Sequence, residues 1–440
     1  MRLIQPGSAR SSSSAGPSGH RAGVFGADPA RGRFARLVCL VVGVIGWVNL
    51  AILGRAMLSH NPPQAGFDLQ LLLDAARRVA AGGSPYDPTA VANGLQARDL
   101  FYSYPPPVAQ ILVPFSGLPT WLVLTGWCLG AIAGLGAIAA LLSRSPIGRP
   151  MVAMPALSLD AALLALAAAP YFFPFAVALL FGNVDAWFPL LCGGVMLTLV
   201  AGGRAPSRGA AALGGIGLAV AAAVKLHPGT LLVWLATRWS GAVRPRRPAA
   251  IAIAAAALTG LAILGLSLLA GGPRPWGEYL DYLRLGGDAD LASRVNIGPA
   301  SQLALLAGDP GLARPLALAW AVVAIVATIV VARVARDPLE SVAWAIVASL
   351  IVLPVTWYHY PVALLPVALA AWTRSRGMGR SRRVVAWLAA SYVVADASIV
   401  LPVGLWLAVA LLFVAVRLSS PEPSVEPAPE APAPTSASTR

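Results

Sequence analysis

The sequence predicts an all-α polytopic integral membrane protein. Of its 440 residues, 58% are hydrophobic and only 11% are charged, and the mean hydropathy is +0.73. Soluble globular proteins carry about 25% charged residues. Apolar runs recur along almost the whole chain, and lipid requires the backbone groups of each run to be hydrogen-bonded within the protein. A bundle of membrane-spanning helices accounts for both observations.

We expect about twelve transmembrane helices. Several are shorter than the roughly 20 residues that cross a bilayer in a straight helix. The segments that meet at KLHPG (225–229) and at PVTWYHYP (354–361) are tight hairpins or broken helices. The expected spans are residues 37–57, 119–142, 154–171, 184–200, 210–225, 228–239, 249–270, 315–333, 340–356, 361–373, 384–397 and 399–416.

Arginines in the short loops predict the orientation in the membrane. They gather on one side of the expected spans, whereas the short turns on the other side, such as 171–183, contain none. The positive-inside rule puts that arginine-rich side, and the N-terminus, in the cytosol. The two long loops, 58–118 and 271–314, are then extracytoplasmic and carry most of the acidic residues outside the tails. The working face is therefore expected outside the plasma membrane.

The net charge of +14 follows from this topology. Since no basic stripe is interleaved with aromatic residues, we expect no nucleic-acid partner. Residues 1–33 and 419–440 are expected to be disordered cytoplasmic tails, the second rich in Pro, Ala and Glu, around a transmembrane domain at 34–418. The three cysteines lie in apolar runs without metal-ligand spacing, so they are expected to pack as apolar side chains.

The stretch FDLQLLLDAARRVAAGGSPYDP (67–88) follows the first span directly. Its apolar residues recur at helical spacing from Leu69 to Ala80, which predicts an amphipathic helix lying in the membrane interface. Asp74 falls on the opposite, solvated face. Asp68 lies at the helix start, where spacing leaves two alternatives open: an N-cap, which Asp favours, or a functional acid.

Other candidate residues cluster at the same outer ends of the spans. Lys225 and His227 stand in AAAVKLHPG, where a lysine in an apolar run indicates function, the alternative being a side chain that reaches the surface. Asn183 and Asp185 in GNVDAW are either helix caps or site residues. The further candidates for substrate binding are Tyr86, Tyr104, Asn296, Trp357 and His359.

Two more acids, Asp160 and Asp396, lie within or at the ends of spans and are either functional or paired structural groups. The sequence contains no HExxH, P-loop or GxSxG motif and no cluster of metal ligands. Carboxylates, a lysine, a histidine and aromatic residues at one outer surface indicate chemistry on a membrane-borne substrate with a polar head.

The motifs occur in a recognisable order. FDLQLLLDAARRVAAGGSPYDP, YSYPPPVAQILVPFSGLP, GNVD, KLHP, NIGPASQ and LPVTWYHY together resemble glycosyltransferase family 87, over about residues 37–375. The resemblance implies the GT-C membrane fold and a polyprenyl-phosphate-mannose-dependent α-mannosyltransferase, or an arabinofuranosyltransferase of the same family. The partners it implies are a polyprenyl-phosphate sugar, a glycolipid or polysaccharide acceptor and membrane lipids, with no cofactor and no metal.

The same resemblance implies roles for individual residues. Asp68 matches the catalytic acid of the first outer loop, and Lys225 and His359 match positions expected to bind the donor phosphate. Asp185 stands where the family often has Asn, and Tyr360 replaces a second His. A flippase for a lipid-linked sugar is the competing hypothesis, and it predicts ionisable residues at mid-membrane and two similar halves of the chain.

Overall fold

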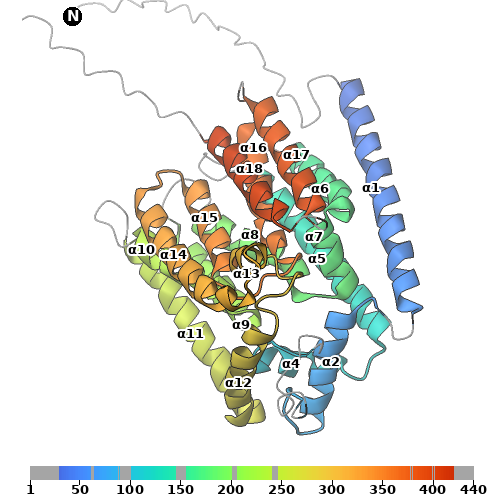
Figure 1. The fold of residues 1–440 in the computed structure, drawn as a ribbon. Helices are drawn as coiled ribbons and strands as arrows, with labels where there is room; N and C mark the ends of the chain where they lie inside the picture. Colours follow the sequence, from blue (N-terminus) through green and yellow to red (C-terminus); the bar gives the residue numbers. More distant parts are fainter. Residues whose placement is uncertain are drawn as a thin grey trace, which may run out of the picture.

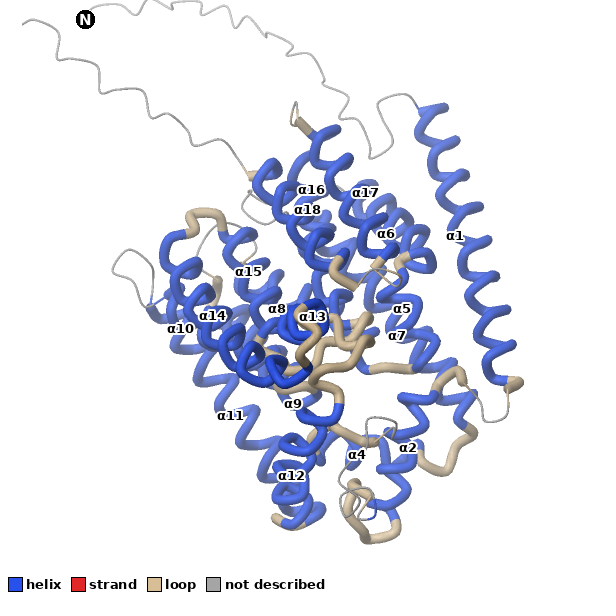
Figure 2. The backbone as a smooth tube through the Cα atoms, in the orientation of Figure 1, coloured by secondary structure: helices blue, strands red, loops and turns tan. Residues whose placement is uncertain are grey.

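The computed structural model describes residues 29–60, 64–87, 89, 101–144, 155–200, 206–239, 246–376, 378, 380–398, 400 and 402–420. The tails predicted to be disordered lie mostly outside these residues. The described part is built of helices and contains no strand (Figures 1 and 2). Its α-helices are α1 (Pro29–Leu58), α2 (Phe67–Ala80), α4 (Pro106–Leu112), α5 (Thr120–Arg144), α6 (Pro155–Ala168), α7 (Phe173–Phe181), α8 (Phe188–Leu199), α9 (Arg208–Val224), α10 (Thr230–Trp239), α11 (Arg246–Gly271), α12 (Arg274–Ala289), α13 (Pro299–Leu306), α14 (Ala313–Val334), α15 (Pro338–Ile351), α16 (Leu365–Ser375), α17 (Ser381–Ala397) and α18 (Gly404–Ser419). Short 3-10 helices lie between them: η1 (Val113–Phe115), η2 (Ala169–Tyr171), η3 (Val184–Trp187), η4 (His227–Gly229), η5 (Pro310–Leu312) and η6 (Tyr360–Leu364).

Four helices of the described part are long and apolar enough to cross a membrane by length and composition. They are Gly32–Leu58, Thr120–Arg144, Arg247–Gly271 and Pro310–Val334. A fifth span exists if the bent pair Leu159–Tyr171 and Phe173–Phe181 counts as one. Shorter apolar helices, among them α8, α9, α15 and α18, make up much of the remaining bundle. The helical membrane-protein class is thus confirmed, whereas the number of twelve crossings stays a prediction.

The bend within that pair corrects one expectation from the sequence. Residues 171–183 were expected to form a short turn, but they contain α7, which leaves α6 and η2 at 75°. Proline has no backbone N–H and cannot continue a helix, so Pro170 and Pro174 on either side of extended Phe172 allow the chain to stop and restart. Asp396 Oδ1 accepts a hydrogen bond from the Phe173 N–H (2.7 Å). Asp396, whose role the sequence left open, thus has a structural partner.

Helix α2 is amphipathic as expected, but its apolar stripe does not face lipid. Leu69, Leu72, Leu73 and Ala76 are each 0% exposed, because they pack into a core formed with α4, α5 and the segment before α8. The expectation that this stripe faces lipid is therefore wrong, whereas the position of the helix at the membrane interface stays a prediction. The physical reason is that α4, which sequence patterning could not pair with α2, supplies the apolar surface instead of the bilayer.

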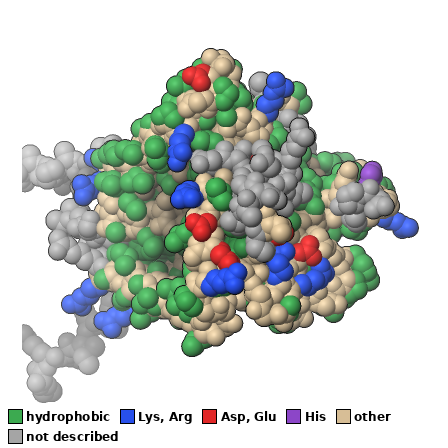
Figure 3. All heavy atoms as spheres, turned by 60° about the horizontal axis from the view of Figure 1, so that its bottom comes forward, with side chains coloured by type: hydrophobic (Ala, Val, Ile, Leu, Met, Phe, Trp, Pro, Cys, Tyr) green, Lys and Arg blue, Asp and Glu red, His purple; other side chains and the backbone are tan. Residues whose placement is uncertain are grey.

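An aromatic cluster joins α2 and α4 to α12, and these three helices lie together at the lower end of the molecule in Figure 1. The ring of Tyr86 packs against those of Tyr102, Tyr279 and Tyr282. Burial raises the pKa of the Tyr86 and Tyr279 phenols, so they stay neutral. Seen from this end, basic and acidic side chains lie close to one another among apolar ones (Figure 3).

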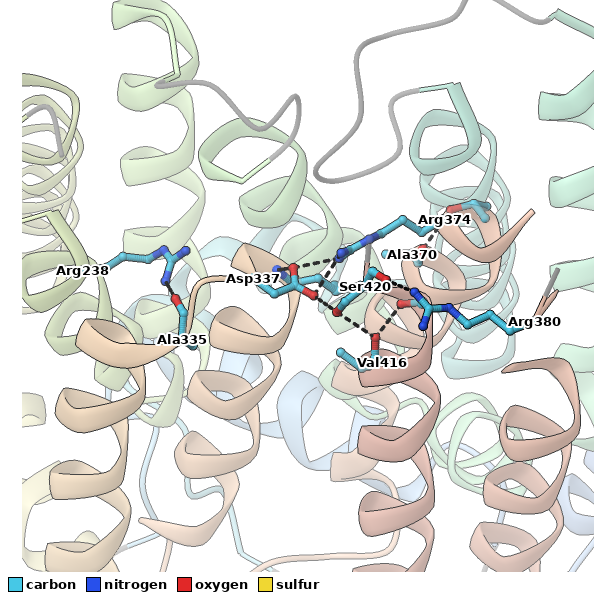
Figure 4. A network of polar contacts seen from close by, with 11 residues as sticks. Arg238, Ala335, Asp337, Ala370, Arg374, Arg380, Val416 and Ser420 are labelled. Carbon is cyan, nitrogen blue, oxygen red and sulfur yellow. Dashed lines mark hydrogen bonds and ion pairs between the residues drawn. The ribbon is translucent and has the colours of Figure 1, made fainter. Parts of the chain in front are cut away.

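The opposite end of the bundle holds the arginines Arg374, Arg376, Arg380, Arg382 and Arg383, and we refer to it as the Arg-rich end. There the Arg374 guanidinium donates from Nη1 and Nη2 to the two oxygens of Asp337, at 2.8 and 3.0 Å (Figure 4). Ser420 donates to the same carboxylate, and Arg380 donates to the Ser420 carbonyl at 2.6 Å. This network ties the start of α15 to the ends of α16 and α18. A second ion pair, Arg36 with Asp160 at 2.7 Å, joins α1 to α6 and answers the open question about Asp160 in favour of a structural partner.

Candidate active site

Asp68 is placed by the way α2 docks on the end of α7. Gly66 precedes the helix with a left-handed φ of 71°, and its N–H donates to the Leu180 carbonyl at 2.7 Å. The rings of Phe67 and Phe181 meet with centroids 4.2 Å apart. Asp68 is the second residue of α2 and caps no helix, because Gly66 occupies the N-cap position. The cap alternative is therefore wrong, and the carboxylate is directed to other partners.

The GNVD segment supplies the first of these partners. Gly182 ends α7 with a φ of 66°, which favours glycine, and a Cβ at this position would lie 2.6 Å from the Leu69 Cβ. The close approach brings the Asn183 amide to Asp68, and Nδ2 donates to Asp68 Oδ2 at 2.6 Å. The other end of the same amide accepts from the backbone N–H of Asp185 at 2.9 Å. Asn183 thus joins two carboxylates that lie on different segments.

Asp185 in turn holds the two predicted phosphate ligands. Lys225, the C-cap residue that follows α9, places Nζ 2.6 Å from Asp185 Oδ2, and His359 Nε2 lies 3.1 Å from the same oxygen. The Lys225 ammonium also lies over the Tyr360 ring, 3.8 Å from its centroid, and 5.8 Å from the centroid of Tyr104. The acid side chain is 2% exposed and the lysine side chain 11%. The site therefore pairs a buried cation with a buried anion beside two aromatic faces.

Burial raises the pKa of the Asp68 carboxyl above its ordinary value. Three neighbours oppose the shift: His359, then the hydrogen bond from Asn183, then Lys225. The charge of Asp185 adds to the increase. A general base works best when its pKa lies nearer the working pH than that of a free carboxylate. Asp68 is partly exposed, so a substrate hydroxyl can approach the group that this environment makes more basic.

The remaining candidates occupy different positions around this centre. His227 packs between the rings of Phe188 and Tyr360, with centroids 5.3 and 6.0 Å away, and its Nδ1 lies 3.2 Å from Ser349 Oγ. Half-buried Trp357 accepts on its carbonyl the N–H of Tyr360. These residues support the walls of the site around the Tyr360 ring.

Tyr86 supports the site from a distance. Its hydroxyl donates to the Tyr104 carbonyl at 2.8 Å, while its ring belongs to the aromatic cluster that includes Tyr279 and Tyr282 of α12. Tyr104 is the member of the pair that reaches the site, because its ring is near Lys225.

Asn296 is fully buried, and its amide is engaged with backbone groups. Nδ2 donates to the Pro354 carbonyl at 3.0 Å, and Oδ1 accepts the N–H groups of Gly298 and Thr356, both at 2.9 Å. These bonds fix the loop before α13 to the irregular segment that leads from α15 to His359. The structure therefore gives Asn296 a positioning role in this segment.

Sequence reasoning did not anticipate two features of the site. Asp185 was a candidate for substrate binding, and the structure makes it the counter-ion of Lys225, with His359 Nε2 3.1 Å from the same oxygen. Tyr360 was noted only as a departure from the resemblance, yet its ring forms the floor beneath the lysine. The aromatic run WYHY was the available signal for Tyr360, but an aromatic belt at the membrane surface explained that run equally well.

An all-helical membrane protein with a partly exposed acid, a buried lysine and a histidine in one polar centre fits a membrane-bound transferase without a metal motif. The chain belongs to glycosyltransferase family 87, whose family model matches residues 102–356, more than half of its length. It is thus a membrane glycosyltransferase, which uses a sugar donor and an acceptor. No curated protein matches the chain. No solved structure matches it.

The matched segment contains Asn183, Asp185 and Lys225 but ends before His359 and begins after Asp68. The structure connects both outlying residues to the matched segment. Asn183 donates to Asp68, and Asp185 lies in ion-pair distance of His359. The residues of the site that the sequence motifs suggested therefore lie both inside and outside the segment that the family model matches.

Proposed function

We propose that the protein transfers a sugar from a polyprenyl-phosphate donor to a hydroxyl of a lipid or glycan acceptor, and that this sugar is mannose. The observation that carries this proposal is the chain of contacts from Asp68 through Asn183 to Asp185 and Lys225. It holds a base and a cation in one site, and the second acid, Asp185, is paired with Lys225 instead of lying free opposite the base. Glycoside hydrolases instead need two carboxyl groups that act as a pair across the scissile bond.

The roles follow from where charge changes during transfer. Asp68 accepts the proton of the acceptor hydroxyl, whose oxygen forms a bond to the anomeric carbon of the sugar. The bond from that carbon to the phosphate oxygen breaks, and its electron pair leaves with the polyprenyl phosphate. Lys225 and His359 stabilise the negative charge that grows on the phosphate. Attack opposite the leaving group gives inversion at the anomeric carbon.

The environment proposed for this reaction is the extracytoplasmic face of the plasma membrane. In this topology the chain has a GT-C fold with about twelve spans and a cytosolic N-terminus. The proposal rests on the arginines of the short loops, which the sequence puts on the side of the expected spans opposite the long loop that contains Asp68. A lipid-linked donor suits this face, since its chain can stay in the bilayer while its sugar reaches the polar centre.

Asp68→Asn is expected to abolish transfer, because it removes the base and keeps the size of the side chain. General-base catalysis contributes about 10²–10⁴-fold, so kcat should fall by that factor. The measurement is product formation by purified protein in liposomes that contain labelled polyprenyl-phosphate mannose and, separately, the arabinose analogue. The donor that yields labelled product identifies the sugar.

Asp74→Asn is the matched control on the same helix. Asp74 is 43% exposed and bonded to Gln70 and Arg77, away from the polar centre. This variant should retain wild-type activity. If Asp68→Asn also keeps near wild-type activity, Asp68 is not the base. Movement of label across the bilayer without a new glycosidic bond would instead support a flippase.

A further inference from the structure

A large apolar cavity lies between the helices beside the site. Its volume is about 690 Å³, and its walls come from α1, α5, α6, α16, α17 and α18. This is within the range of about 300–1,000 Å³ that is typical of ligand pockets. Figure 1 shows α1 at the edge of the bundle next to α6, so this wall of the cavity belongs to a peripheral helix.

The three hydroxyl groups in the walls already have partners. The hydroxyls of Tyr171, Ser391 and Tyr392 each donate to a backbone carbonyl, of Val42, Ala408 and Ala168 respectively. These three hydroxyls therefore offer no unused donor to a ligand. The rest of the lining consists almost wholly of aliphatic and aromatic side chains. Such walls favour a hydrocarbon ligand, because burial of apolar surface is the main favourable contribution that they can make to the free energy of binding.

The cavity extends along the bundle axis from the site end toward the Arg-rich end. On α17 its lining runs from Val385 to Ala395. Ten residues of α-helix rise about 15 Å, which is roughly half the thickness of the hydrocarbon core of a bilayer. An extended chain parallel to the lipid tails fits this shape.

One short element contributes to both the cavity and the site. Helix η6 begins at Tyr360, whose ring lies under Lys225, directly after His359. The next residue, Pro361, and Leu364 of the same element line the cavity. Only Tyr360 therefore separates His359, the proposed phosphate ligand, from Pro361, where the apolar wall begins.

We propose that this cavity binds the hydrocarbon chain of the lipid donor, with the chain running from the phosphate at His359 past η6 and along α16 and α17. The proposal rests on the proposed function, because it takes the donor head to be a polyprenyl phosphate. The donor is the occupant that this connection favours, since its chain is covalently attached to the phosphate and Pro361, two residues after His359, lines the cavity. An ordinary bilayer lipid that occupies the space without relation to the reaction is the competing outcome of the test.

Two substitutions fill the cavity from two different helices, α6 and α17. Ala168 and Ala389 both line it and are exposed, so tryptophan at either position occupies the space without displacing core residues. Ala257→Trp is the matched control, because Ala257 is also exposed but lies on α11, which does not line the cavity. Donors with long and very short prenyl chains and the same head are compared for each variant.

For Ala168→Trp and Ala389→Trp, the KM of the long-chain donor should rise about tenfold, the affinity supplied by roughly two buried methylene groups. The KM of the short-chain donor and the kcat of both donors should stay unchanged. Ala257→Trp should change neither. If both donors lose affinity equally, or neither does, the cavity does not bind the donor chain.

A binding experiment separates this inference from the proposed reaction. The purified protein in lipid nanodiscs is irradiated with a photoreactive polyprenyl phosphate that carries no sugar, and the labelled peptides are mapped by mass spectrometry. Label is expected on the cavity walls of α16 and α17, reduced by Ala389→Trp and not by Ala257→Trp. Uniform label over the lipid-facing helices overturns the inference even if sugar transfer is observed. Cavity label without transfer from any polyprenyl-phosphate sugar supports the inference and overturns the proposed function.

Discussion

Two carboxylates shielded from solvent, Asp337 before α15 and Asp185 in η3, contact basic side chains in different ways. Asp337 precedes α15, and both of its oxygens accept from the Arg374 guanidinium, at 2.8 and 3.0 Å. His359 follows α15 and shares one oxygen of Asp185 with Lys225, at 3.1 and 2.6 Å. The first arrangement is bidentate and the second is convergent.

The difference shows which pair has capacity for a further ligand. Both terminal nitrogens of Arg374 are engaged with Asp337, so that pair acts as a clamp between helix ends. An ammonium has three N–H donors. Lys225 directs one to Asp185 and lies over the Tyr360 ring, which attracts it without supplying a lone-pair acceptor. Lys225 can thus contact an added anion while it keeps its counter-ion.

The largest expected effect on stability comes from breaking the clamp. Arg374→Met leaves the Asp337 carboxylate largely buried and without its cation, and loss of one partner of a buried pair costs about 3–5 kcal/mol of the free energy of unfolding. Thermal unfolding in detergent measures the loss. Activity per folded molecule should stay near wild type, because the clamp is at the end of the bundle away from Asp68.

Arg417→Gln is the control at the same end. Arg417 pairs with Glu340 but is 69% exposed, so its removal should cost about 0–1 kcal/mol. Equal destabilisation by both variants would mean that burial does not distinguish the two pairs. A fall in activity per folded Arg374→Met molecule would contradict the assignment of the clamp to structure alone.

The convergent pair is tested by Lys225→Met, which should lower kcat/KM by about 10²–10³-fold, the usual effect of removing one group that stabilises transition-state charge. The double variant Lys225→Met/Asp185→Asn removes both buried charges and decides between two roles. If Lys225 acts on the donor phosphate, the double variant stays inactive. If Lys225 only neutralises Asp185, the double variant recovers activity. Transfer assays in liposomes measure both variants.

The contrast between local and distant contacts also explains what the sequence could predict. The spans depend on hydropathy within each segment, so each expected span overlaps a helix of the structure, whereas its crossing of the membrane stays a prediction for all but the four or five long helices. Helix α7 was missed because it is only nine residues long, follows Pro170 closely and has Pro174 as its second residue, which is typical of a turn. Lys225 was identified from its own surroundings, since a lysine in an apolar run is costly.

The partners of the site residues could not be predicted in the same way. Asp185 is 40 positions from Lys225, and Asn183 is 115 positions from Asp68. Only the docking of α2 on α7, through two glycines with positive φ, brings the second pair together. Single-sequence patterns report the environment of a residue but not which distant residue completes it.

The smallest expected effect concerns the link between the two carboxylates. Asn183→Ala removes the hydrogen bond that favours the charged form of Asp68, so the pKa of this carboxyl rises further above its ordinary value. The base works deprotonated, so activity falls as pH drops through this pKa, and a higher pKa moves the acid limb of kcat/KM to higher pH. Hydrogen bonds to charged groups contribute about 1.5–3 kcal/mol, which corresponds to a shift of about one to two pH units.

Gln70→Ala provides the comparison on the same helix, because Gln70 donates to Asp74 and not to Asp68. Its acid limb should coincide with that of the wild type. The Asn183→Ala protein should recover part of its lost activity as the pH is raised, since the base is then ionised without help from the amide. A uniform loss of rate at every pH would show that Asn183 only holds the GNVD segment in place, and the two carboxylates would then be linked by geometry but not through the protonation of Asp68.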